Sequence, residues 1–194
     1  MTNKRIQKKR RSLPQAGFTI IETLMAVLVL SIAMAGSLAL AAKGLGLIQV
    51  ARQEVSAVYL AQDAMEYIKG VRDTNCLVGN SLLTNCTTTT WLGAARSLGT
   101  RCGDSAGCQI DTLTGDVSVC PAAGCAALNY DATGAFYTYS GVSSVPTAFV
   151  RSVYIQTPVG GNADEASTTV LVQWSGQGGV TRSVRIHDDL YNWQ

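Results

Sequence analysis

Two groups of residues in this sequence have the types and spacing to take part in chemistry. The first is the junction of Gly17 and Phe18, which follows a basic stretch and precedes a long apolar run with one acid, Glu22, near its start. A small residue at such a boundary is typical of a site where an exported chain is cut. The second group is six cysteines, which can form disulfides or bind a metal. They are Cys76, Cys86, Cys102, Cys108, Cys120 and Cys125.

The cysteine spacings favour disulfides over a metal site. Zinc sites use close cysteine pairs with roughly two to four residues between them, often together with histidine. Only the gap between Cys120 and Cys125 fits that window, and the one histidine, His187, lies far along the chain. We therefore predict disulfides in an oxidising compartment, and neither a metal nor a cofactor. The sequence leaves the pairing open, although pairing of neighbours along the chain is the simplest arrangement.

Positive charge is concentrated at the N-terminus. Six of the fifteen basic residues fall within the first eleven positions, and no acid precedes Glu22. Without residues 1–17, nine basic and thirteen acidic residues remain, so the net charge changes from +2 to −4. A basic cluster can bind nucleic acid, but an apolar run follows this one directly. The order predicts a basic leader on the cytoplasmic side of a membrane, and no specific nucleic-acid partner.

The apolar run predicts a helix that crosses a membrane. Twenty residues from Thr23 to Ala42 carry no charge, and as an α-helix they span about 30 Å, the thickness of a hydrocarbon core. We assign residues 18–43 to this transmembrane and assembly helix. A secretory signal is cut after its apolar region. The candidate cut after Gly17 lies before that region, so the helix would stay on the mature chain.

A second helical pattern, amphipathic in character, continues the first. Apolar residues follow one another at steps of three or four, which predicts a helix through residues 44–73 with one apolar stripe. The stripe consists of Leu47, Ala51, Val55, Val58, Ala61, Met65 and Ile68.

The remainder of the chain predicts a loop region followed by a sheet. Residues 74–146 are rich in Gly, Ser and Thr and carry the cysteines, which indicates a Cys-rich loop region. Residues 147–194 alternate between apolar and polar side chains and predict a three-stranded antiparallel β-meander with one buried side. The fold class we expect is α+β, with the long N-terminal helix packed on the C-terminal antiparallel sheet.

Glu22 is an acid in apolar surroundings, the fifth residue after Gly17. A carboxylate in a membrane or a filament core costs a few kcal/mol or more unless it has a partner. A new amino terminus at Phe18 of a neighbouring subunit would supply the positive charge. The alternative is an acid in the first turn of the helix, stabilised by the helix dipole. The two interpretations are compatible.

No catalytic residue is predicted. His187 falls on the polar face of the last strand, and no Ser, Cys or acid constellation can be tied to it. Asp188 and Asp189 lack the oxygen-rich spacing of a calcium loop and indicate a solvated strand end. We therefore expect that the chain is not an enzyme.

Residues 17–30, GFTIIETLMAVLVL, resemble the processing motif of type IV prepilins and type II secretion pseudopilins. The resemblance implies cleavage after Gly17 by a membrane prepilin peptidase, N-methylation of Phe18 by the same enzyme, and a role of Glu22 in assembly. It also implies other pilin subunits, the inner-membrane assembly machinery and the membrane as partners. The motif is closer to minor pilins and pseudopilins than to major pilins, which commonly have a single C-terminal cysteine pair.

The expected function is that of a structural subunit, a minor pilin or pseudopilin of a type IV pilus or a type II secretion-type filament. It would cross the cytoplasmic membrane once, with its C-terminal domain outside, and then enter an extracellular or periplasmic filament. The alternative is a single-pass membrane-anchored, disulfide-rich adhesin or DNA-uptake module. A secreted enzyme with an uncleaved anchor would need a catalytic constellation, and the sequence shows none.

Overall fold

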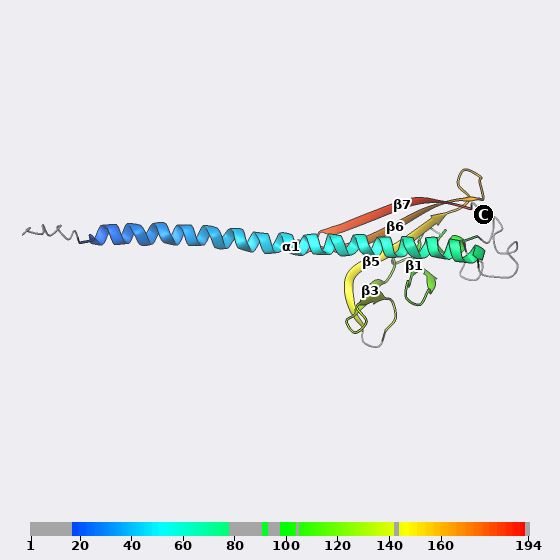
Figure 1. Ribbon diagram of the computed structural model, residues 1–194, viewed down its shortest axis with the longest axis horizontal. Helices are drawn as coiled ribbons and strands as arrows, with labels where there is room; N and C mark the ends of the chain where they lie inside the picture. Colours follow the sequence, from blue (N-terminus) through cyan, green and yellow to red (C-terminus); the bar gives the residue numbers. More distant parts are fainter. Residues whose placement is uncertain (1–16, 78–90, 93–97, 104, 142–143, 193–194) are drawn as a thin grey trace, which may run out of the picture. The chain divides into compact units, whose positions relative to one another are not determined.

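A computed structural model describes residues 17–77, 91–92, 98–103, 105–141 and 144–192 (Figure 1). The chain divides into two compact units, residues 1–47 and residues 48–194. Helix α1 (Ile20–Leu77) contributes to both units.

In the first unit, α1 exposes apolar side chains on all sides. Every residue from 20 to 43 is exposed, and these include isoleucine, leucine, valine and methionine side chains all around the helix. The segment has a window with a mean hydropathy of 2.4, so by length and composition it is a candidate membrane span. A helix that is apolar all round is typical of a membrane span or of the interior of an assembly.

The hydroxyl groups in the apolar part of α1 are bonded within the helix itself. Thr23 Oγ1 donates to the carbonyl of Ile20 at 2.8 Å, Ser31 Oγ to that of Val27 at 2.7 Å, and Ser37 Oγ to that of Met34 at 2.9 Å. Hydrocarbon offers no hydrogen-bond partner, so polar groups that enter it must be satisfied internally. These three hydroxyls therefore add little to the cost of placing the helix in lipid.

In the second unit, α1 buries one narrow face. The buried side chains are Ala57, Leu60, Ala61, Ala64, Met65 and Ile68. The predicted stripe is correct for its last three members but wrong for its first part, because Leu47 is 71% exposed and Val55 is 55% exposed. The periodicity marks apolar positions, but only the presence of a packing partner decides which of them are covered. The helix also continues to Leu77, beyond the predicted residue 73.

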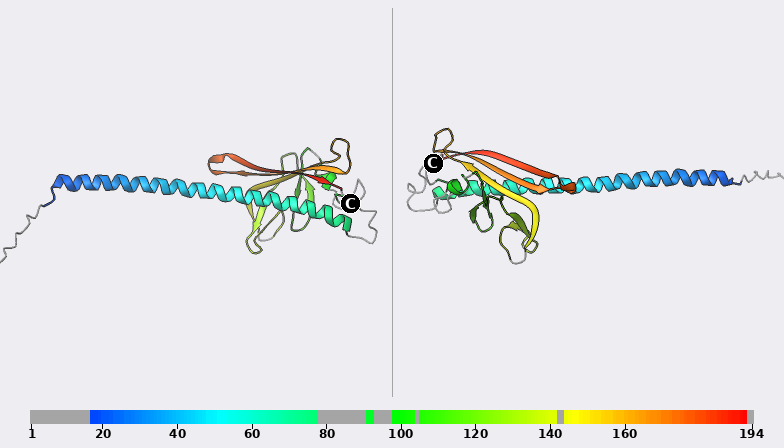
Figure 2. Two further views of the ribbon diagram at one scale, coloured as in Figure 1. Left: turned by 45° about the horizontal axis from the view of Figure 1, so that its top comes forward. Right: turned by 180° about the vertical axis from the view of Figure 1, so that it is seen from behind.

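The described strands form one antiparallel sheet beside this part of α1 (Figure 1; Figure 2). Strand β5 lies at its centre and pairs with β6 on one side and with β1 and β3 on the other. Strands β2, β4 and β7 pair with β1, β3 and β6 respectively. The strands are β1 (Cys108–Ile110), β2 (Val117–Val119), β3 (Ala127–Asp131), β4 (Phe136–Thr138), β5 (Ser144–Gln156), β6 (Glu165–Ser175) and β7 (Thr181–Tyr191).

The expected α+β fold, a long N-terminal helix packed on a C-terminal antiparallel sheet, is confirmed. The meander corresponds to β5, β6 and β7, although β5 already begins at Ser144. The Cys-rich loop region expected over residues 74–146 holds both described disulfides, and it also contains β1 to β4 and the short helix α2 (Leu98–Arg101), which were not predicted. These strands have three to five residues each, too few for a period-two pattern to stand out from the surrounding turns.

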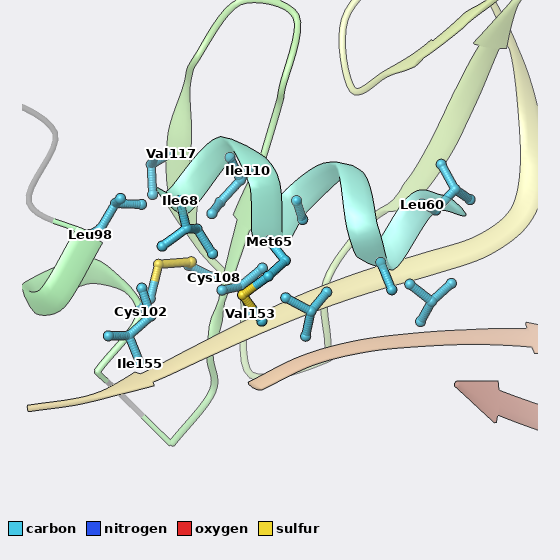
Figure 3. Close-up of a cluster of buried hydrophobic side chains, with 14 of the residues drawn as sticks. Leu60, Met65, Ile68, Leu98, Cys102, Cys108, Ile110, Val117, Val153 and Ile155 are labelled. Carbon is cyan, nitrogen blue, oxygen red and sulfur yellow. A yellow bond between two sulfur atoms is a disulfide. The ribbon is translucent and has the colours of Figure 1, made fainter. Parts of the chain in front are cut away.

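Two disulfides join neighbouring cysteines. Cys102 pairs with Cys108 and Cys120 with Cys125. The first pair lies in the buried cluster together with Ile68 and Ile155, as Figure 3 shows. The second closes the turn between β2 and β3. Cys86 lies outside the described residues, so the third pair, with Cys76, stays a prediction.

Candidate functional site

The junction predicted to be cut lies in non-helical backbone directly before α1. Residues 17–19 are not helical, and Phe18 is 78% exposed. The space around Gly17 is also open, since no described atom lies within 4 Å of the position that a Cβ would occupy. Exposed, irregular backbone of this kind is where proteolysis concentrates. The Gly17–Phe18 bond is therefore accessible to a peptidase.

Thr19 fixes the point at which the helix begins. The backbone N–H of Glu22 donates to Thr19 Oγ1 at 3.3 Å, and the N–H groups of Glu22 and Thr23 donate to the Thr19 carbonyl at 3.1 and 3.2 Å. A threonine whose side chain accepts from the third residue of the helix is a typical N-cap. This role of Thr19 was not predicted, although Thr followed three residues later by Glu is a known capping pattern.

Glu22 lies in the first turn of α1 and is exposed. Its position allows the dipole of the helix to stabilise the carboxylate, as one interpretation of the sequence requires. The side chains around it are apolar and exposed, including those of Ile20 and Ile21. In lipid or in a packed assembly, the dipole alone offsets only part of the cost of this charge. A pair between Glu22 and a neighbouring Phe18 amine remains a prediction.

An ionic centre in the second unit was not predicted. Arg151 on β5 is fully buried, and its Nη1 donates to Asp63 Oδ2 and to the Leu60 carbonyl, both at 2.9 Å. Its Nη2 donates to the Ile110 carbonyl at 2.7 Å. One side chain thus joins α1, β1 and β5. The signal was present in the sequence, because alternation places Arg151 on the inward face of the strand together with Phe149 and Val153.

Asp111 is a second buried polar group that organises the turns around the sheet. Its Oδ1 accepts from the backbone N–H groups of Leu113 and Thr114, and its Oδ2 accepts from the Thr138 hydroxyl at 2.6 Å and from the Tyr139 N–H at 2.9 Å. Burial alone would raise the pKa of Asp111, but the hydrogen bonds from Thr138, Tyr139, Thr114 and Leu113 outweigh it and hold the pKa below its usual value.

The lowered pKa of Asp111 predicts a loss of stability in acid. A carboxyl whose pKa is lower in the folded than in the unfolded chain stabilises the fold above its unfolded pKa, about 4, and loses this contribution as the pH falls through the folded pKa. We expect the free energy of unfolding to decrease below about pH 4, and to decrease less steeply in Asp111→Asn. Denaturant titrations of both proteins at several pH values measure how steeply the free energy of unfolding falls with pH in each. Equal slopes would show that Asp111 does not contribute.

The remaining predicted residues lie apart from these groups. His187 is exposed, as predicted, with its ring 3.1 Å from Thr169 Oγ1 and 3.4 Å from Asp189 Oδ1. Asp188 forms an ion pair with Lys69 of α1, so it also links the last strand to the helix. Among the described residues, no three or more His, Cys, Asp or Glu side chains are grouped so that they could hold a metal.

Comparison with known proteins identifies the N-terminal segment. Residues 13–38 match the family model described as the prokaryotic N-terminal methylation motif. The match includes Gly17, Phe18 and Glu22 and the first part of the apolar helix. The curated proteins and the solved structures gave no match.

Proposed function

We propose that this chain, which carries the N-terminal signature of type IV prepilins and pseudopilins, is a structural subunit of a filament and not an enzyme. Prepilin peptidase would cut it after Gly17, and α1 would assemble it with other pilins. One observation carries this proposal. An open, non-helical Gly17–Phe18 junction lies between a basic leader and a helix whose apolar side chains are exposed on all sides.

Each part of the junction has a role in this proposal. The leader keeps residues 1–17 in the cytoplasm until cleavage. Cleavage creates a new amine at Phe18, which the same enzyme then methylates. Glu22 pairs with the Phe18 amine of the adjacent subunit and so offsets the cost of two charges in apolar surroundings. The inner-membrane assembly machinery then moves the subunit from the membrane into the filament.

The second unit supports a location of the C-terminal domain outside the cytoplasm. Two disulfides hold it, and disulfides persist in oxidising compartments. They also favour a minor pilin or a pseudopilin, of a type IV pilus or a type II secretion-type filament, over a major pilin. The alternative is a membrane-anchored adhesin or DNA-uptake module, which would keep the helix but would not need cleavage at Gly17.

Glu22→Gln tests assembly separately from folding. Glutamine keeps the size of the side chain and removes its charge, so the variant is expected to be cleaved and inserted, with native disulfides. It would lose its attraction to the neighbouring amine, and removal of one member of a buried pair costs about 3–5 kcal/mol. We expect little Glu22→Gln in the filament fraction, measured by quantitative immunoblot against the membrane fraction.

Glu66→Gln is the matched control. Glu66 is an exposed acid on the same helix, outside the apolar run, and its replacement is expected to leave incorporation unchanged. Equal amounts of Glu22→Gln and unmodified protein in the filament would show that Glu22 is only a helix-end residue. Crosslinking from position 22 to the N-terminus of a neighbouring subunit would support the pair directly.

A further inference from the structure

In the second unit, α1 carries apolar side chains on the side opposite to its buried face. The buried face centres on Ala57 and Ala64. Ile48, Val55 and Tyr59 follow one another at steps of seven and four residues, so they lie together on the opposite side. These three side chains are 51%, 55% and 67% exposed. The outer side of a surface helix normally carries polar residues, so this apolar stripe indicates an interaction surface.

The stripe continues into a cleft. Tyr59 lines a cleft of about 480 Å³, and the turn before β2 and the strand β4 supply the rest of its apolar wall. Leu113 of that turn is 56% exposed. We call the stripe and the apolar wall together the Tyr59 surface, which consists of Ile48, Val55, Tyr59, Leu113, Phe136 and Tyr137.

The cleft has an acidic edge. Asp63 is part of its lining, and the turns that supply Leu113 and Ala135 also carry Asp116 and Asp131. Among the described residues, only Asp63 of these three acids has a cationic partner, the buried Arg151. A group that covers the Tyr59 surface therefore needs apolar side chains together with a positive charge.

This chain itself offers such a group. Arg52 lies on the same stripe of α1, between Ile48 and Val55, and is exposed. Its guanidinium forms no ion pair with any described residue. A guanidinium is attracted to aromatic faces as well as to carboxylates. The end of the stripe around Arg52 is thus complementary to the Tyr59 end of the stripe on a second copy.

Charge decides how two copies would be aligned. Two copies that enter one filament from the same membrane run parallel, an orientation that rests on the proposed function. In register, Arg52 of one copy would face Arg52 of the other, and the like charges would repel. A shift of seven residues, about 10 Å along the helix, keeps the same side of α1 in contact. It sets Ile48 against Val55 and Arg52 against Tyr59.

We propose that Arg52 of one copy docks on the Tyr59 surface of a second copy, shifted by about two helical turns along α1. The guanidinium lies against the ring of Tyr59 and near the acidic edge, while Ile48 contacts Val55. A shifted contact joins two different parts of the surface, so it continues from copy to copy and does not close into a dimer. The chain must then occur in several adjacent copies.

A photo-reactive phenylalanine analogue at position 59 of the full-length protein tests this contact in cells. Tyr59 is exposed, so the replacement leaves the fold intact. After illumination, products with the mass of two chains are isolated on a denaturing gel and digested with trypsin. Cleavage after Lys43 and Arg52 releases residues 44–52 as one peptide. We expect this peptide of the second copy to be the main partner of position 59.

Arg52→Gln should lower the yield of the two-chain product about tenfold, because the attraction of the cation to the ring and to the acidic edge is lost. Arg52→Lys keeps the positive charge and should retain most of the yield. Arg185→Gln is the matched control, since it removes an exposed arginine of β7 and should leave the yield unchanged.

Three results would each overturn the proposal. They are the absence of a two-chain product, a main crosslink to another part of the chain or to a different protein, and equal yields with Arg52→Gln and Arg185→Gln. The share of the chain in the filament fraction is measured in the same cells. Its absence from that fraction would contradict the proposed function as well, whereas its presence without the crosslink would remove only this contact.

Discussion

Gly17→Leu is expected to leave the whole chain uncleaved in the membrane. No described atom lies near the position of a Cβ at residue 17, and the residue is outside α1, so leucine does not disturb this protein. The need for glycine must therefore come from the peptidase that binds the junction. Mobility on a denaturing gel separates the precursor from the mature chain. The expected effect is near-complete loss of the mature form.

Gly36→Leu is the control for this experiment. No described atom lies within 4 Å of the position of a Cβ at Gly36 either, but this residue lies inside α1 and away from the junction. This variant should be cleaved at the normal rate. Normal cleavage of Gly17→Leu would mean that the junction is not the site of processing.

Arg151→Met is expected to lower the free energy of unfolding of the second unit by about 1.5–3 kcal/mol, the contribution of a hydrogen bond from a charged group. Methionine fills similar space but cannot donate to the carbonyls of Leu60 and Ile110, so both hydrogen bonds from the guanidinium are lost. It also removes the ion pair that joins α1 to β5. Denaturant unfolding of the full-length protein in micelles, followed by tryptophan fluorescence, measures the change.

Arg182→Met gives the comparison that isolates the effect of burial. Arg182 forms an ion pair with Glu54 of α1 at 2.7 Å, but both side chains are substantially exposed. Exposed pairs contribute about 0–1 kcal/mol, so this variant should unfold almost like the unmodified protein. If both arginine variants lose the same small amount, Arg151 does not hold the helix to the sheet.

The sequence could predict those parts of the fold that a periodic pattern of neighbouring residues marks. The apolar run from Thr23 to Ala42 and the alternation in β5, β6 and β7 are long enough to show their periods. The helix face was predictable only in part, because Val55 fits the period of Ala61 but no described residue of the second unit covers it. Which apolar positions are buried depends on where the sheet lies, and the sequence of the helix does not contain that information.

The candidate sites also differ in how far the sequence could predict them. Gly17, Phe18 and Glu22 lie within six positions, so their pattern is legible in the sequence. The contacts of Arg151 link residues 88 positions apart in one case and 91 in another, and they exist only once the sheet has packed on α1. Such sites follow from strand register and packing, and no local pattern encodes them.

The intact mass and the N-terminal sequence of the protein extracted from membranes test the central claim most directly. The account predicts that residues 1–17 are missing, that the chain begins at Phe18, and that its amino group carries one methyl group. A mature chain that begins after the apolar run, near Ala41 and Ala42, would contradict it, because the protein would then be released by ordinary secretion without the helix that is proposed to assemble it.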